Sequence, residues 1–172
     1  METVYFHDPA GCVGIAIPGR QVAYTGLRVH QEPARYRGSE ALAPFLQEDF
    51  HFFFEDEEPD VSLYAVPRVL ILGYDSAGGY FASTQMDVRL DENFPLLYIS
   101  RERKVYQVEG ESSLLMTGTF RWRECLRSSG AVKLYPSREA AQRDYLIHDL
   151  AKLDLPDLPD PPGRNQQIKQ GG

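Results

Sequence analysis

The sequence has few of the features that mark secreted, membrane or cysteine-dependent proteins. Its two cysteines, Cys12 and Cys125, lie far apart without a C-x-x-C pair, which excludes a disulfide framework, and both are expected to be small core residues. No apolar run approaches the roughly 20 residues that span a bilayer. The first residues carry neither a basic nor an apolar region of a signal peptide. We therefore expect a cytoplasmic protein that does not enter a membrane.

Catalytic signatures are also missing. The sequence has no G-x-S-x-G, no P-loop and no dinucleotide-binding fingerprint. Its histidines show no spacing that would place two metal ligands on one face; they are His7, His30, His51 and His148. Carboxylates occur in polar runs without the apolar surroundings that raise a pKa for acid catalysis. The sequence thus predicts no catalytic residues, no metal and no cofactor.

Basic residues are absent from one long stretch. The formal net charge is −7, which argues against binding nucleic acid or an anionic membrane with the whole surface. Between Gly38 and Pro67 there are eight acidic residues and no Lys or Arg: Glu40, Glu48, Asp49, Glu55, Asp56, Glu57, Glu58 and Asp60. This segment alone carries −8, and the rest of the chain is close to neutral. It indicates a surface for a basic protein partner, although a solvated helix face and turn explains it equally well.

The 172 residues include 42% hydrophobic residues, which suffices for one domain with a sizeable core. We assign residues 1–153 to this domain. Residues 154–172 are rich in Pro, Asp and Gln and cannot bury enough apolar surface to offset the entropy of ordering. They are expected to form a mobile or surface-draped tail.

The stretch Val66–Ala82 predicts the centre of the fold. Two apolar runs, Val69–Tyr74 and Tyr80–Ala82, flank a loop that contains Asp75, Gly78 and Gly79, which is typical of a β-hairpin. One of the two glycines is expected to adopt a positive φ. The first run is apolar almost continuously, so both faces of this strand should be covered.

Further patterns predict strands around this hairpin and helices beside it. Apolar spacing of three and four predicts helices over Ser39–Phe54 and Ser137–Leu153, and a broken helix over Glu111–Leu126. Strands are predicted over Val61–Ala65, Pro95–Ile99, Val105–Val108 and Lys133–Tyr135, with an amino-terminal meander made of Val4–Phe6, Val13–Ile17 and Val22–Tyr24. The predicted fold class is α+β, a predominantly antiparallel sheet packed with two or three helices.

Three segments resemble the SUKH superfamily, α+β domains that include a fungal cell-wall-assembly regulator and many bacterial immunity proteins. They are the strand, glycine turn and return strand of Ile71–Ala82, the proline-led aromatic strand of Phe94–Ile99, and the segment Phe120–Leu126. The resemblance covers residues 61–127. It implies a non-catalytic domain that binds and silences a cognate toxin, and it carries no catalytic residues that could be transferred.

Three hypotheses about function follow. The leading one is a SUKH-like immunity protein that recognises a basic, nuclease-type toxin through Glu48, Asp49, Glu55–Glu58 and Asp60. The alternative is a small enzyme or ligand-binding domain with a pocket near the hairpin, lined by Tyr74, Asp75 and Tyr80. The third is an interaction module without a toxin partner. The sequence leaves the oligomeric state open.

Overall fold

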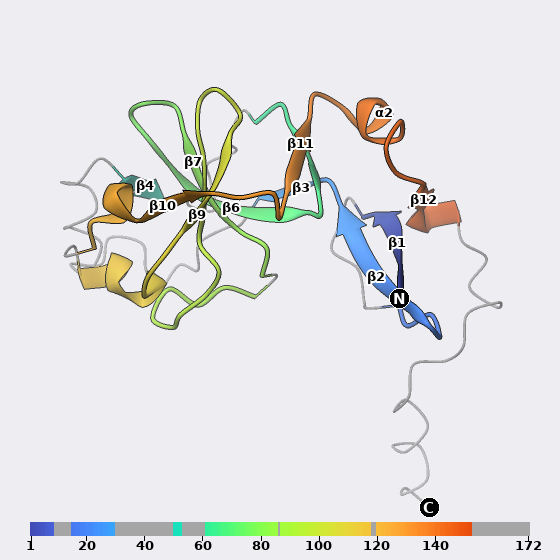
Figure 1. Ribbon diagram of the computed structural model, residues 1–172, viewed down its shortest axis with the longest axis horizontal. Helices are drawn as coiled ribbons and strands as arrows, with labels where there is room; N and C mark the ends of the chain where they lie inside the picture. Colours follow the sequence, from blue (N-terminus) through green and yellow to red (C-terminus); the bar gives the residue numbers. More distant parts are fainter. Residues whose placement is uncertain (9–14, 30–49, 53–60, 86, 118–119, 153–172) are drawn as a thin grey trace, which may run out of the picture.

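The computed structural model describes residues 1–8, 15–29, 50–52, 61–85, 87–117 and 120–152. Within these ranges the chain consists mainly of β-strands, which form three sheets (Figure 1). The predicted α+β class is therefore wrong, because the described part contains a single α-helix, the one-turn α2 (Arg138–Ala141), together with short 3₁₀ turns.

The main sheet has seven strands in the order β10-β9-β8-β7-β6-β3, with β4 also paired to β6. Their bounds are β3 (Leu27–Val29), β4 (Phe50–Phe52), β6 (Val69–Asp75), β7 (Tyr80–Ser83), β8 (Leu97–Ile99), β9 (Val105–Val108) and β10 (Leu126–Ser128). All pairs are antiparallel except β3 with β6. Strand β7 lies along one edge of β6, and β3 and β4 share the other edge. The predicted central strand and its hairpin are thus confirmed.

Two smaller sheets complete the described structure. In the first, β1 (Glu2–His7) lies between β2 (Arg20–Thr25) and β12 (Ile147–Asp149), and both neighbours run parallel to it. In the second, β5 (Tyr64–Val66) pairs antiparallel with β11 (Lys133–Tyr135). Figure 1 shows β5 and β11 between the parallel sheet and the main sheet.

The parallel sheet corrects the predicted amino-terminal meander. Consecutive strands of a meander run antiparallel, whereas β1 and β2 are parallel in register from Glu2 opposite Arg20 to His7 opposite Thr25. The middle strand of that prediction, Val13–Ile17, is also wrong over its described part, since residues 15–17 form no strand and residues 13 and 14 lie outside the described ranges. The partner that completes the sheet, β12, comes from the other end of the chain.

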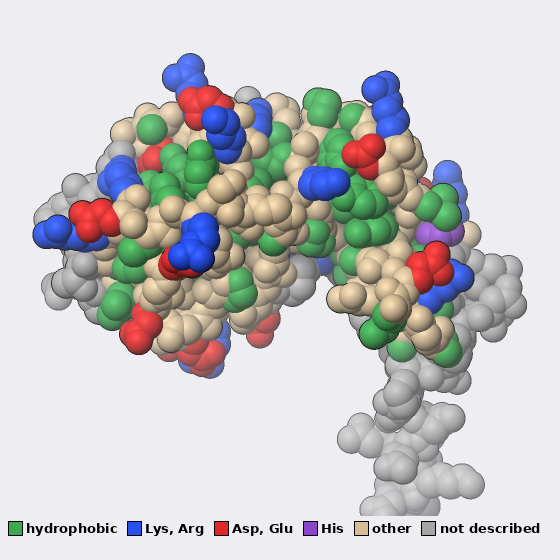
Figure 2. All heavy atoms as spheres, in the orientation of Figure 1, with side chains coloured by type: hydrophobic (Ala, Val, Ile, Leu, Met, Phe, Trp, Pro, Cys, Tyr) green, Lys and Arg blue, Asp and Glu red, His purple; other side chains and the backbone are tan. Residues whose placement is uncertain are grey.

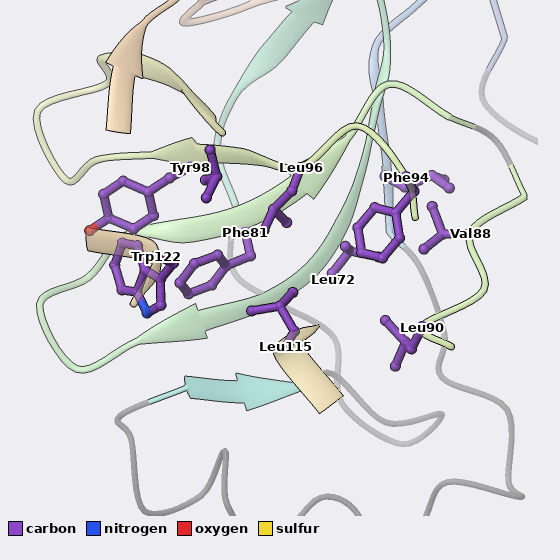
Figure 3. Close-up of a cluster of buried hydrophobic side chains, with 11 residues drawn as sticks. Leu72, Phe81, Val88, Leu90, Phe94, Leu96, Tyr98, Leu115 and Trp122 are labelled. Carbon is purple, nitrogen blue, oxygen red and sulfur yellow. The ribbon is translucent and has the colours of Figure 1, made fainter. Parts of the chain in front are cut away.

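The hydrophobic core lies on both faces of the main sheet. Leu70 and Leu72 of β6 belong to one buried cluster, and Val69 and Ile71 belong to another. Successive side chains of a strand point to opposite faces, so the almost continuous apolar run of β6 is what a strand covered on both sides requires. Figure 3 shows the first cluster, in which Val88, Leu90 and Phe94 of a long connection cover the sheet.

In the described residues, 3₁₀ turns and short strands take the place of the predicted helices. Over Glu111–Leu126 the chain forms the turns η3 (Ser112–Thr117) and η4 (Trp122–Cys125), and Leu126 already begins β10. Of the predicted helix Ser39–Phe54, only residues 50–52 are described, and they form strand β4. These segments bury Leu115 and Trp122 without a continuous helix.

The predicted helix Ser137–Leu153 is correct only at its start. Ser137 caps α2 as expected, because its hydroxyl accepts a hydrogen bond from the Ala140 amide (3.2 Å). The helix ends after one turn, the chain enters β12, and the short 3₁₀ turn η5 (Leu150–Lys152) follows. Extended pairing with β1 buries Ile147 and leaves Leu146 77% exposed. Sheet pairing therefore overrides a helical spacing that is only a weak preference.

Candidate functional site

The predicted turn residues form a hydrogen-bonded cluster at the end of the central hairpin. The Gly79 amide donates to Asp75 Oδ1 (2.8 Å), and the Tyr98 hydroxyl donates to Asp75 Oδ2 (2.9 Å). The Gly78 amide donates to the Asp75 carbonyl (3.2 Å), and Gly78 has φ +84°, the conformation expected for one glycine of the pair. Both oxygens of the buried Asp75 carboxylate are thus engaged within the fold.

Aromatic side chains pack around Tyr98 of this hydrogen-bonded cluster. The Tyr98 ring lies 4.9 Å from the Trp122 ring and 5.4 Å from the Phe81 ring. Burial raises the pKa of the Tyr98 hydroxyl, and its hydrogen bond to Asp75 raises it further. Gly79 lies so close to the Tyr98 ring that a Cβ at position 79 would overlap the Tyr98 hydroxyl. Asp75, Gly79 and Tyr98 therefore act together to stabilise the turn.

The hypothesised pocket beside the hairpin gains no support from this geometry. Asp75 is committed to Gly79 and Tyr98, and the Tyr74 ring stacks on His51 at 5.0 Å. A hollow of about 300 Å³ does occur, but it is lined by Gln142–Ile147, in the connection between α2 and β12.

The acidic residues predicted to bind a partner lie outside the described residues. They are Glu48, Asp49, Glu55, Asp56, Glu57, Glu58 and Asp60. What the structure does describe is β4, which falls inside this segment and pairs with β6 from Phe50 opposite Asp75 to Phe52 opposite Gly73. The acidic segment is thus joined to the main sheet by β4.

A cluster of polar side chains that the sequence did not reveal lies at the carboxyl ends of the parallel strands. His7 ends β1, Thr25 ends β2 and Asp149 ends β12, and in the register of the sheet both Thr25 and Asp149 stand opposite His7. Paired residues of neighbouring strands point to the same face. In open α/β sheets, ligands bind at the carboxyl ends of the parallel strands.

His7 and Thr25 of this cluster are joined with Tyr64 and the Phe6 carbonyl in one chain of hydrogen bonds. The Thr25 hydroxyl is 3.2 Å from the Phe6 carbonyl oxygen and 2.7 Å from the Tyr64 hydroxyl, and His7 Nδ1 is 3.0 Å from the same Tyr64 hydroxyl. The His7 and Tyr64 rings also stack, with centroids 5.7 Å apart. The chain connects β1 and β2 of the parallel sheet with β5.

Asp149, opposite His7 in the register of β1 and β12, lies close to two cations. Arg138 of α2 lies 3.7 Å from Asp149, measured from Nη1 to Oδ2, and Lys152 lies 3.8 Å from the same oxygen. Burial lowers the pKa of His7 and the Arg138 charge lowers it further, while Asp149 and Asp8 oppose the shift. Burial also raises the pKa of Tyr64. At neutral pH both groups are therefore held uncharged.

One signal in the sequence could have located this cluster. Each strand ends in a polar residue after an apolar stretch, as in Val4–His7, Val22–Thr25 and Leu146–Asp149. In a meander these ends would lie at opposite edges, so they meet only because the strands are parallel. Recognising the cluster required the topology.

The described residues contain no group of three or more His, Cys, Asp or Glu side chains arranged to hold a metal ion. Within the same ranges, no helix has the length and apolar character needed to cross a bilayer. Comparisons with protein-family models, with curated proteins and with solved structures give no match for this chain.

Proposed function

We propose that this chain is a non-catalytic protein-binding domain similar to SUKH immunity proteins, which neutralises a cognate toxin in the cytoplasm through its acidic segment, Glu48–Asp60. The observation that carries the proposal is that the three segments with the SUKH resemblance lie together. Ile71–Ala82 forms β6, the turn and β7, Phe94–Ile99 leads into β8, and Phe120–Leu126 contains η4. These are neighbours in one sheet and one buried cluster.

Direct contacts join these segments. Phe81 of β7 meets Trp122 of η4 edge to face, with ring centroids 4.7 Å apart, and Tyr98 of β8 packs on Trp122 and bonds to Asp75 of the turn. A resemblance spread over somewhat more than a third of the sequence therefore corresponds to one structural unit. The parallel sheet and α2 lie outside the resemblance.

The distribution of charge supports the acidic segment as the binding surface. Ion pairs in the described residues join basic and acidic side chains, as in Arg127 with Glu109 (3.0 Å) and Arg89 with Glu92 (3.2 Å). Figure 2 shows both signs interspersed over one face. The concentrated negative charge belongs to residues 38–67, and complementary charge across an interface accelerates association with a basic partner.

The test is co-expression with a toxin encoded beside this protein. Glu55, Asp56, Glu57 and Glu58 are each changed to Lys in one variant. The control variant reverses four exposed acids of the main-sheet region, Asp87, Glu92, Glu111 and Glu124, and so changes the net charge equally. Protection of cells and the rate of toxin binding at increasing salt are measured for both.

We expect the first variant to lose protection while it remains folded, and the control to protect like the wild type. Association of the wild type should slow as salt rises, because salt screens exposed charges over roughly 10 Å at 0.1 M. Full protection by the first variant, or binding that does not respond to salt, would contradict the proposal.

A further inference from the structure

The direction of the hydrogen bonds around Tyr64 fixes which nitrogen of His7 carries a proton. The Phe6 carbonyl can only accept, so the Thr25 hydroxyl donates its one proton to it. Thr25 must then accept from the Tyr64 hydroxyl, and Tyr64 in turn must accept from His7 Nδ1. His7 is thus the Nδ1–H tautomer, and its Nε2 carries a lone pair.

Two charged side chains lie at this edge, one an acceptor and the other a donor of hydrogen bonds. Asp149 is opposite His7 in the register of β1 and β12; its Oδ1 accepts a hydrogen bond from the Ala151 amide (3.3 Å), and its Oδ2 lies 3.8 Å from Lys152 Nζ. Arg138 adds guanidinium donors, which at 3.7 Å from Asp149 are beyond hydrogen-bond distance of it. Arg138 Nε has no acceptor among the described residues. The side chains of Arg138 and Asp149 each remain 26% exposed, so a solute can reach them.

We propose that this edge of the parallel sheet binds a small oxyanion that retains a proton on one oxygen, with phosphate as the simplest case. Arg138 takes the charged oxygens, and His7 Nε2 together with Asp149 accepts the hydrogen bond of the protonated oxygen. This site is independent of the proposed toxin-binding function, because it uses none of the acidic residues 48–60.

The acceptors determine which anion fits. A fully deprotonated anion such as sulfate brings only lone pairs to His7 Nε2 and Asp149, and the carboxylate repels it. Inorganic phosphate at pH 7 always keeps at least one O–H and can donate it. A phosphomonoester has a second pKa near 6 and at pH 7 mostly lacks that proton. The site therefore discriminates by protonation, since phosphate and sulfate share shape and size.

The first experiment needs no ligand. Long-range proton–nitrogen NMR correlations of the full chain report which nitrogen of each imidazole is protonated. We expect an unprotonated Nε2 at His7. An unprotonated Nδ1 at His7 would overturn the proposal.

The second experiment measures binding of inorganic phosphate, sulfate and glycerol phosphate at pH 7 by NMR titration. We expect phosphate to bind about tenfold more tightly than sulfate, the effect of roughly one charge-assisted hydrogen bond. Glycerol phosphate should bind as weakly as sulfate; if it binds as tightly as phosphate, the site takes phosphate esters and the requirement for a proton is wrong. Equal binding of phosphate and sulfate would overturn the proposal.

Two matched variants assign the discrimination to His7. His7→Phe keeps a ring against Tyr64 but removes Nε2, and it should lower phosphate affinity about tenfold, to that of sulfate. His148→Phe removes an imidazole from the opposite face of the same sheet, where His148 packs on Phe6, and should leave both affinities unchanged. An equal loss in the two variants would contradict the assignment, and if His7→Phe does not fold, the comparison of anions on the wild type still decides.

Discussion

At the scale of single residues, Gly78 and Gly79 occupy the same turn but are required for different reasons. Gly78 has φ +84°, and a Cβ there would meet only the flexible Arg101 side chain at 3.7 Å. A Cβ on Gly79 would overlap the Tyr98 hydroxyl and break up its bond to Asp75. We predict that Gly78→Ala costs about 1 kcal/mol for a left-handed backbone and that Gly79→Ala costs about 2–3 kcal/mol. Urea unfolding measures both, and the reverse order would refute the role of Gly79.

Tyr98 makes stability depend on alkaline pH. Its pKa is raised in the folded state by burial and by Asp75. Above a pH of about 10, the unfolded chain loses this proton and the folded chain keeps it, so the free energy of unfolding falls as pH rises. We predict that Tyr98→Phe weakens this dependence, measured by thermal melts between pH 8 and pH 11. The residual slope reflects Tyr64 and Tyr135, whose pKa values are also raised.

His7 has the opposite effect on the acid side. Its pKa is lowered in the folded state, mainly by burial. The unfolded chain therefore takes up a proton first as pH falls below about 6.5, and stability is lost between neutral and weakly acidic pH. His7→Phe should flatten the change in melting temperature between pH 7 and pH 5. An unchanged slope in that variant would show that His7 is not held neutral in the folded protein.

At the scale of elements, β6 should dominate stability. Leu70 and Leu72 are each 1% exposed, and they contact the cluster formed by the irregular connection and the 3₁₀ turns. We predict that Leu70→Ala or Leu72→Ala costs about 2–5 kcal/mol. The control is Val29→Ala in β3, at 36% exposure, which should cost at most about 0.5 kcal/mol. If Leu70→Ala and Leu72→Ala lower the free energy of unfolding no more than the control does, β6 does not belong to the core.

Strands and turns could be predicted from the sequence where the local pattern of residues favours the same structure as the strand pairing in the fold. Val69–Asp75 combines a continuous apolar run with a glycine turn, so strand, hairpin and positive φ follow from the sequence. Over 138–149 the spacing of Ala141 and Tyr145 fits a helix, and only pairing of Ile147 with Tyr5 decides for a strand. That pairing joins residues 142 positions apart, and no local pattern reports it. The cluster at His7 depends on the same long-range pairing.

At the scale of the whole molecule, a few contacts join the parallel sheet to the rest of the structure. The Gly26 amide donates to the Ala65 carbonyl (2.9 Å), and the Arg68 amide donates to the Tyr24 carbonyl (2.7 Å). Arg68 Nη1 also forms a buried ion pair with Asp8 Oδ2 (3.0 Å) and a hydrogen bond to the Asp8 carbonyl (3.1 Å). Asp8 directly follows β1, and Arg68 directly precedes β6. This pair therefore links the central strands of the two sheets.

Two Arg→Met variants test whether the link stabilises the molecule. Arg68→Met removes the buried ion pair and should cost about 3–5 kcal/mol, because the Asp8 carboxylate loses a partner away from water. Arg20→Met removes an ion pair of the same parallel sheet, Arg20 with Glu2 at 3.5 Å, whose side chains are 49% and 74% exposed. Exposed pairs contribute at most about 1 kcal/mol. Urea unfolding is followed by Trp122 fluorescence, which reports on the main sheet. We expect a large loss in the free energy of unfolding only for Arg68→Met. Equally small losses in the two variants would mean that the two sheets are stabilised separately.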